Sequence, residues 1–178
     1  MDVQAVFNKY YQPGTPLYQS VWSHSRLVAE KALQLAKAHP ELNLDLDFVY
    51  EAAMLHDIGV FLTHAPSIYC MGDKPYICHG ILGAELMRAD GYPRHALVCE
   101  RHTGTGLTVD DIIAQNLPLP HRDLCPVSLE EKLVCLADKF YSKSNPDREK
   151  PLDKVRQSVA RYGEDSLRRF DEMAKLFL

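Results

Sequence analysis

Ala52-Ala53-Met54-Leu55-His56-Asp57-Ile58-Gly59 is the stretch that decides the fold. An apolar run of helical character ends in an adjacent histidine and aspartate, and a glycine follows two residues later. Both side chains are strong metal ligands, and a helix end leaves the backbone free to turn successive side chains toward one ion. A buried hydrogen bond between His56 and Asp57 would give the same local pattern, so the rest of the chain has to distinguish the two.

The helix that leads into this stretch is expected to be central. Asp45 is a suitable N-cap, and the residues that follow are apolar on nearly every side, which is typical of a buried helix. A long first core helix is predicted from Thr15-Pro16 to His39-Pro40, with His24 inside it.

Further helices follow from the spacing of apolar residues. Ser128 and Glu131 have the spacing of a capping box, and the helix after them is expected to run to Asn145-Pro146 with Asp138 in its middle. The other expected helices cover residues 1–12, 79–90, 93–102 and 108–116, with one or two more from Pro151 onward.

The segment from residue 59 to residue 78 has no helical period and contains prolines, glycines and aromatics, so we expect a loop that lines or covers a site. No run alternates long enough for a sheet. The prediction is an all-α helical bundle of about five core helices plus terminal helices. We expect a single domain over residues 1–178, with a core over about 16–142 and with helices 1–12 and 151–177 packed on it.

Composition limits the class of protein. The chain has 178 residues, of which 46% are apolar and 25% charged, as in globular proteins. A formal charge of −4 and no basic stripe argue against binding a nucleic acid polymer. No segment is long enough to cross a membrane, and the N-terminus lacks a signal-peptide pattern. Five scattered cysteines predict reduced thiols in a cytoplasmic protein. The sequence does not indicate an oligomeric state.

Six potential metal ligands lie on or at the ends of these elements. They are His24, His56, Asp57, His79, His102 and Asp138. Asp138 is the most informative, because a carboxylate among apolar neighbours needs a cation or a strong donor. Each histidine alone is explained more readily as an ordinary core or surface residue than as a ligand. We interpret His39, His95 and His121 as structural or solvated, and His64 as the one remaining histidine that could face a substrate.

The order of these residues resembles the HD superfamily of metal-dependent phosphohydrolases. Leu55-His56-Asp57-Ile58-Gly59 carries the likeness most clearly, together with His24 before it and Leu136-Ala137-Asp138-Lys139 after it. The segments around His79 and His102 are similar to the extra histidines of the branch that binds two metals, which includes diadenosine tetraphosphate hydrolases and HD-GYP phosphodiesterases. Val60 departs from many HD-GYP members, which have lysine there, and a cyclic dinucleotide substrate is therefore not favoured.

The resemblance implies a site with two divalent ions. Asp57 would bridge them, with His24, His56 and Asp138 on one ion and His79 and His102 on the other. This nitrogen-rich set suits iron, manganese, cobalt, nickel or zinc. The implied reaction is hydrolysis of a phosphoester or phosphoanhydride in a small nucleotide-like substrate by a metal-activated water.

Cations near the ligands are candidates for charge stabilisation at the phosphate. We assign catalytic roles to Asp57, His56, Lys139 and Arg101. Lys74, Arg88 and Lys143 are further candidates, and Tyr69 or Tyr76 could stack on a base. Ordinary surface charges and loop aromatics would look the same in the sequence.

Two other functions are compatible with the pattern. The arrangement of these six ligands also resembles that of di-iron oxygenases of the HD fold, which act on a small polyol or phosphonate. A non-catalytic ligand sensor is the third reading, although the presence of all six ligands argues against it.

Overall fold

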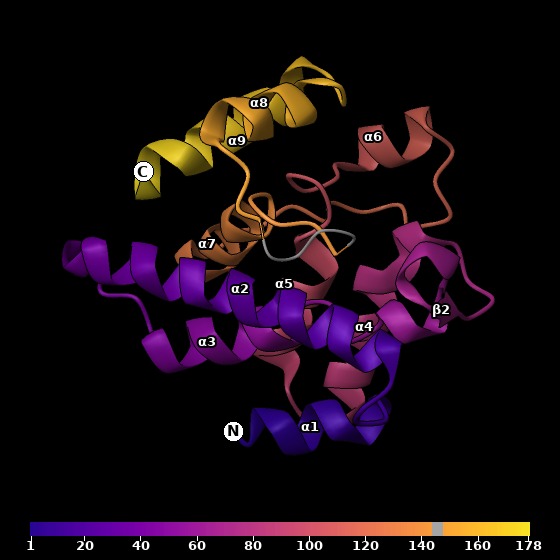
Figure 1. Ribbon diagram of the computed structural model, residues 1–178. Helices are drawn as coiled ribbons and strands as arrows, with labels where there is room; N and C mark the ends of the chain where they lie inside the picture. The colour runs from indigo at the N-terminus through magenta and orange to yellow at the C-terminus, as the bar shows by residue number, and fades with distance from the viewer. Residues whose placement is uncertain (144–147) are drawn as a thin grey trace.

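The computed structural model describes residues 1–143 and 148–178 and confirms the all-α class (Figure 1). The α-helices are α1 (Val3–Tyr10), α2 (Pro16–Ala38), α3 (Leu46–Leu55), α4 (His79–Ala89), α5 (Pro93–Arg101), α6 (Val109–Ala114), α7 (Leu129–Asp138), α8 (Leu152–Ala160) and α9 (Glu164–Phe177). Short 3-10 turns are η1 (Pro40–Leu42), η2 (Val60–Leu62), η3 (Pro66–Ile68) and η4 (Tyr76–Cys78). Within the described ranges, none of the helices has both the length and the apolar character needed to cross a membrane.

Helix α3 lies at the centre of the bundle, as its composition predicts. Six of its ten residues are buried. It packs against α2 most extensively, and also against α5 and α7. In Figure 1, α1 lies at one end of the bundle and the α8–α9 pair at the opposite end, with α2, α3 and α7 between them. Burial of the apolar faces of these helices supplies the main favourable free energy of folding.

The expected caps of the two central helices are present. Thr15 accepts a hydrogen bond from the Tyr18 N–H at 3.2 Å, and Asp45 accepts one from the Phe48 N–H at 3.0 Å. Each bond satisfies a backbone donor that the first turn of a helix leaves free.

The capping box predicted at Ser128 is only half formed. Ser128 caps α7, but the Glu131 carboxylate accepts from the Val127 N–H at 2.9 Å and pairs with Arg101 instead of reaching back to the cap residue. A reciprocal box occurs at Thr108 and Asp111, at the start of α6.

Asp138 is the last residue of α7, so its predicted position in mid-helix is wrong. The Lys139 N–H bonds to the Leu136 carbonyl, three residues back, which tightens the helix end. Because the chain turns here, Lys139 can fold back toward Asp138. The expected helix end at Asn145-Pro146 lies outside the described residues.

The 59–78 segment contains more local structure than its sequence predicts. Strands β1 (His64–Ala65) and β2 (Cys70–Met71) form a small antiparallel pair, with His64 opposite Met71. A Cβ at Gly72 would lie 2.3 Å from the Leu62 carbonyl oxygen, so only glycine allows the two backbones to approach.

Candidate metal centre

The six predicted ligands converge in the core from five segments. His24 comes from α2, His56 and Asp57 from the end of α3, His79 from the start of α4, His102 from the residue after α5, and Asp138 from the end of α7. The four histidines and Asp57 are buried, and the side chain of Asp138 is 12% exposed. The packing therefore gathers polar side chains into an apolar interior, which is costly unless they bind a partner.

Asp57 lies between two pairs of histidines. Its Oδ2 is 3.3 Å from His24 Nε2 and 3.1 Å from His56 Nε2. Its Oδ1 is 3.4 Å from His79 Nε2 and 3.5 Å from His102 Nε2. One carboxylate oxygen therefore faces each pair, as a carboxylate that bridges two ions would require.

Asp138 completes one side of the cluster. Its Oδ1 is 2.9 Å from His24 Nε2 and 3.5 Å from His56 Nε2. Ligand atoms of His24, His56 and Asp138 all lie within 4.8 Å of one another, and so do those of His56, Asp57 and His102. His79 Nε2 lies 3.0 Å from His102 Nε2, close to the second group.

Backbone carbonyls orient three of the histidines. The Nδ1–H groups of His56, His79 and His102 donate to carbonyls three residues back, those of Ala53, Tyr76 and Cys99, at 2.6 to 2.7 Å. This bond fixes the tautomer and leaves Nε2 directed into the cluster. Three helix ends thus supply both a ligand and the group that orients it.

The charges of the cluster control its protonation. Burial opposes a charge on His56, but Asp57 and Asp138 outweigh it and raise the pKa of His56 to about 9. Burial lowers the pKa of His79 to about 3 and also lowers that of His102. For Asp57, burial opposes ionisation, yet His56 and Lys143 hold its carboxyl pKa well below the usual range.

The donor set fits a divalent transition metal. Among the described residues, His56 Nε2 and Asp57 Oδ1 are buried and have no hydrogen-bond partner, although both point at other ligand atoms. A buried polar atom of this kind normally has a partner, and a divalent cation bound by these residues would supply it. Four imidazoles and two carboxylates favour borderline metals over magnesium or calcium.

Two segments outside the cluster hold the His56-Asp57 turn in place. The Tyr11 hydroxyl, which is buried, lies 3.2 Å from the Asp57 carbonyl and 3.2 Å from the Ile58 carbonyl, and accepts from the Phe61 N–H. A Cβ at Gly59 would lie 2.3 Å from the Gly83 nitrogen, so this glycine lets the turn pack directly on α4. The contact brings Asp57 to His79.

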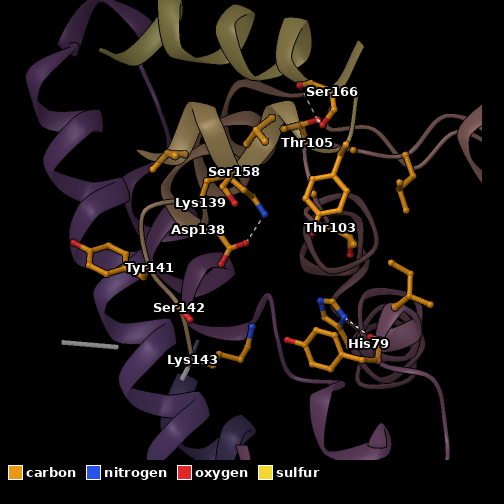
Figure 2. Close-up of a pocket in the computed structure, with 18 of the residues that line it drawn as sticks. His79, Thr103, Thr105, Asp138, Lys139, Tyr141, Ser142, Lys143, Ser158 and Ser166 are labelled. Carbon is orange, nitrogen blue, oxygen red and sulfur yellow. Dashed lines mark hydrogen bonds and ion pairs between the residues drawn. The ribbon is translucent and has the colours of Figure 1, made fainter. Parts of the chain in front are cut away.

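The cluster opens into a cavity of about 650 Å³. In Figure 2, Asp138, Lys139 and Lys143 lie along one side of it and face His79 and Thr103 on the other. Lys139 Nζ is 2.6 Å from Asp138 Oδ2, and Lys143 Nζ is 2.6 Å from Asp57 Oδ2. Both lysines therefore line the cavity beside predicted metal ligands, and their role at a phosphate stays a prediction.

Other predicted site residues lie elsewhere. Arg101 does not line the cavity, because its guanidinium pairs with Glu131 at 3.0 Å. Arg88 pairs with Glu100, also away from the cavity. Tyr76 lines the cavity and stacks on His79 with ring centroids 4.7 Å apart.

The remaining candidates in the 59–78 segment are peripheral. Lys74 and Tyr69 are exposed and do not line the cavity, and the same holds for His64.

The histidines assigned no ligand role differ in burial. His121 is exposed and His39 partly exposed. His95 is buried instead, with Nε2 3.0 Å from Glu51 Oε2. Its neighbours Arg94 and Pro93 suggested an exposed position, but the carboxylate makes burial tolerable.

Part of the cavity wall has no signal in the sequence. Residues from the C-terminal region line it, among them Lys150, Ser158, Tyr162 and Arg169. Helical spacing predicts the helices on which most of them lie, yet it does not predict which part of the bundle those helices face.

Relatives of this chain among known proteins include the following three. Uncharacterized protein MJ0778 of Methanocaldococcus jannaschii is 37% identical over 123 residues, which are 67% of this chain and 65% of that protein. A protein of Thermoplasma volcanium named tRNA (cytidine(56)-2'-O)-methyltransferase is 27% identical over 176 residues, 98% of this chain and 46% of that protein. A protein of the same name from Picrophilus torridus is 35% identical over 120 residues, 67% of this chain and 30% of that protein.

The chain thus spans from less than a third to about two thirds of the length of these relatives. None of the solved structures matches it. The sequence model of the HD-domain family matches residues 21–142, a range that includes all six clustered residues. A metal-dependent hydrolase is what an HD domain implies. The chain belongs to the HD-domain family.

Proposed function

We propose that the protein is a phosphohydrolase that cleaves a phosphoester or phosphoanhydride of a small nucleotide-like substrate. One observation carries this proposal: a carboxylate set between two pairs of histidines lies beside a cavity that two lysines enter. The proposal places one ion with His24, His56, Asp57 and Asp138, and a second with Asp57, His79 and His102. The metal would polarise the phosphate and supply an activated water.

Lys139 and Lys143 have a defined part in this reaction. Each ammonium contacts a carboxylate that is also a proposed metal ligand. When cations bind these carboxylates, the lysines lose part of their attraction to them and can bind phosphate oxygens, as ammonium groups do. The lysines thereby orient the phosphate and stabilise the charge that develops on it.

The cavity favours a small organic phosphate over a polymer. Its volume of about 650 Å³ lies in the range of sites for small ligands and cofactors. The aromatic ring of Tyr76 and the apolar side chains of Leu107 and Leu117 line it and offer surface for a base. The tRNA methyltransferase name of two relatives applies to proteins that extend far beyond the matched region.

A metal and substrate screen tests the proposal. Chelator-treated protein would receive Mn, Fe(II), Co, Ni or Zn and be assayed on p-nitrophenyl phosphate and on nucleotides. We expect metal-dependent release of phosphate, lost in His102→Asn and retained in His121→Asn, because His121 is exposed and away from the cavity. No turnover with any metal in the wild-type protein would overturn the proposal.

The di-iron oxygenase remains a second candidate because the nitrogen-rich set of four histidines and two aspartates also suits iron. Substrate-dependent oxygen uptake and a mixed-valence iron signal in electron paramagnetic resonance would support it. The lysines that reach Asp57 and Asp138 favour the hydrolase, since they match an anionic substrate.

A further inference from the structure

Charged groups in the cavity wall are nearly all paired. Among the described residues, the basic side chains that line it are Lys139, Lys143, Lys150 and Arg169. Lys139 pairs with Asp138, and Lys143 with Asp57. Arg169 Nη2 lies 3.0 Å from Asp111 Oδ2.

Lys150 differs from the other three. Within the described part of the chain, no carboxylate pairs with its ammonium. The carbonyls of Lys139 and Tyr141 are its hydrogen-bond acceptors there, each at the long distance of 3.5 Å. The adjacent Glu149 is unavailable, because it pairs with Lys31 at 2.7 Å and accepts from the Tyr141 hydroxyl.

Burial of Lys150 makes the lack of a carboxylate partner among the described residues costly. The residue is half-buried, and burial, Lys139 and Lys143 together outweigh the opposing effect of Asp138 and lower the pKa of its ammonium. An ammonium that is partly removed from water and close to two other cations gains more than a surface lysine from an anionic partner. The position therefore suits a ligand that brings negative charge into the cavity.

We propose that Lys150 forms a second anion subsite, which holds a second phosphate group of the substrate while the first lies at the metal cluster. This inference rests on the proposed function, and it narrows the substrate class to compounds with at least two phosphate groups, such as a nucleoside diphosphate. The contact of Lys150 with the Lys139 carbonyl places the subsite next to the lysine that reaches Asp138. A single phosphate at the cluster would leave Lys150 without a phosphate partner and, among the described residues, without a carboxylate partner.

Direct anion binding tests the subsite without turnover. Calorimetric titration of metal-loaded protein with pyrophosphate, under conditions in which the wild type does not cleave it, would compare wild type, Lys150→Gln and Lys154→Gln. Lys154 is a matched control, because it lies on α8, is exposed, does not line the cavity and contacts Gln157. We expect pyrophosphate to bind at least tenfold more weakly to Lys150→Gln and within twofold of wild type to Lys154→Gln. Equal binding by wild type and Lys150→Gln would overturn the inference.

Kinetics separate the inference from the proposed function. With a nucleoside diphosphate, Lys150→Gln should raise KM about tenfold and leave kcat within twofold, Lys150→Arg should restore KM, and the monophosphate should show little change. Equal losses on both substrates would contradict a second subsite while leaving the phosphohydrolase intact. Conversely, weaker pyrophosphate binding by Lys150→Gln without turnover of any substrate would support the subsite and count against the phosphohydrolase.

Discussion

Replacing Asp57 with asparagine should destabilise the metal-free protein in a pH-dependent way. Asparagine has nearly the same shape, so the change mainly removes a negative charge that lies 3.1 Å from His56 Nε2 and 2.6 Å from Lys143 Nζ. The carboxylate is fully buried, so water cannot replace it. The variant leaves the His56 imidazolium and the Lys143 ammonium with less negative charge to balance them. Breaking a buried charge pair in this way is strongly destabilising in other proteins.

The contribution of His56 to the free energy of unfolding can be calculated from its pKa. The folded pKa of about 9 lies above the usual value of 6.5, so the folded state binds the proton more tightly. This stabilisation is complete below pH 6.5 and disappears as the pH rises through 9. At pH 7 it amounts to roughly 2 to 3 kcal/mol, and Asp57 and Asp138 share it. We expect Asp57→Asn to remove roughly 1 to 2 kcal/mol of it.

Thermal unfolding of chelator-treated protein measures this difference. For a chain of this length the loss corresponds to about 2 to 8 °C in Tm. The deficit of Asp57→Asn relative to wild type should be larger at pH 7 than at pH 10, where His56 is neutral in both. Asp171→Asn is the control, because Asp171 pairs with Arg156 at the surface and arginine keeps its charge over this range. An equal deficit at the two pH values would refute the assigned coupling.

Three further predictions follow from the same contacts. Tyr11→Phe should lower the free energy of unfolding by about 1 to 3 kcal/mol in chemical denaturation, because the Asp57 and Ile58 carbonyls and the Phe61 N–H lose their contacts with the hydroxyl. An unchanged denaturation midpoint would contradict this prediction. Acid should destabilise the metal-free protein below pH 6.5, because His79 has a folded pKa of about 3 and only the unfolded chain takes up the proton there. The expected loss of unfolding free energy is about 2 kcal/mol by pH 5. In thermal scans His79→Gln should flatten this pH dependence, and an unchanged slope would count against the role of His79. Arg101→Ala should lower kcat less than about threefold and stability by about 1 kcal/mol, because its guanidinium pairs with Glu131 outside the cavity; a loss of activity above tenfold would restore the catalytic role predicted from the sequence.

The sequence by itself determined the helices and the identity of the clustered residues. Caps such as Thr15 and Asp45 act through bonds to residues three positions away, so local spacing is enough to place them. The order His24, His56-Asp57, His79, His102, Asp138 indicated the family, because those residue types are otherwise rare together in apolar elements.

Only the tertiary structure decided how these residues meet and what surrounds them. The direction of a side chain at a helix end depends on where the helix stops, and α7 stops at Asp138, which turns Lys139 into the cavity. Arg101 and Lys150 are both basic residues in polar stretches, yet packing pairs the first with Glu131 and leaves the second beside the cavity without a carboxylate among the described residues. Such differences arise from contacts between segments far apart in the chain, and local periodicity carries no information about them.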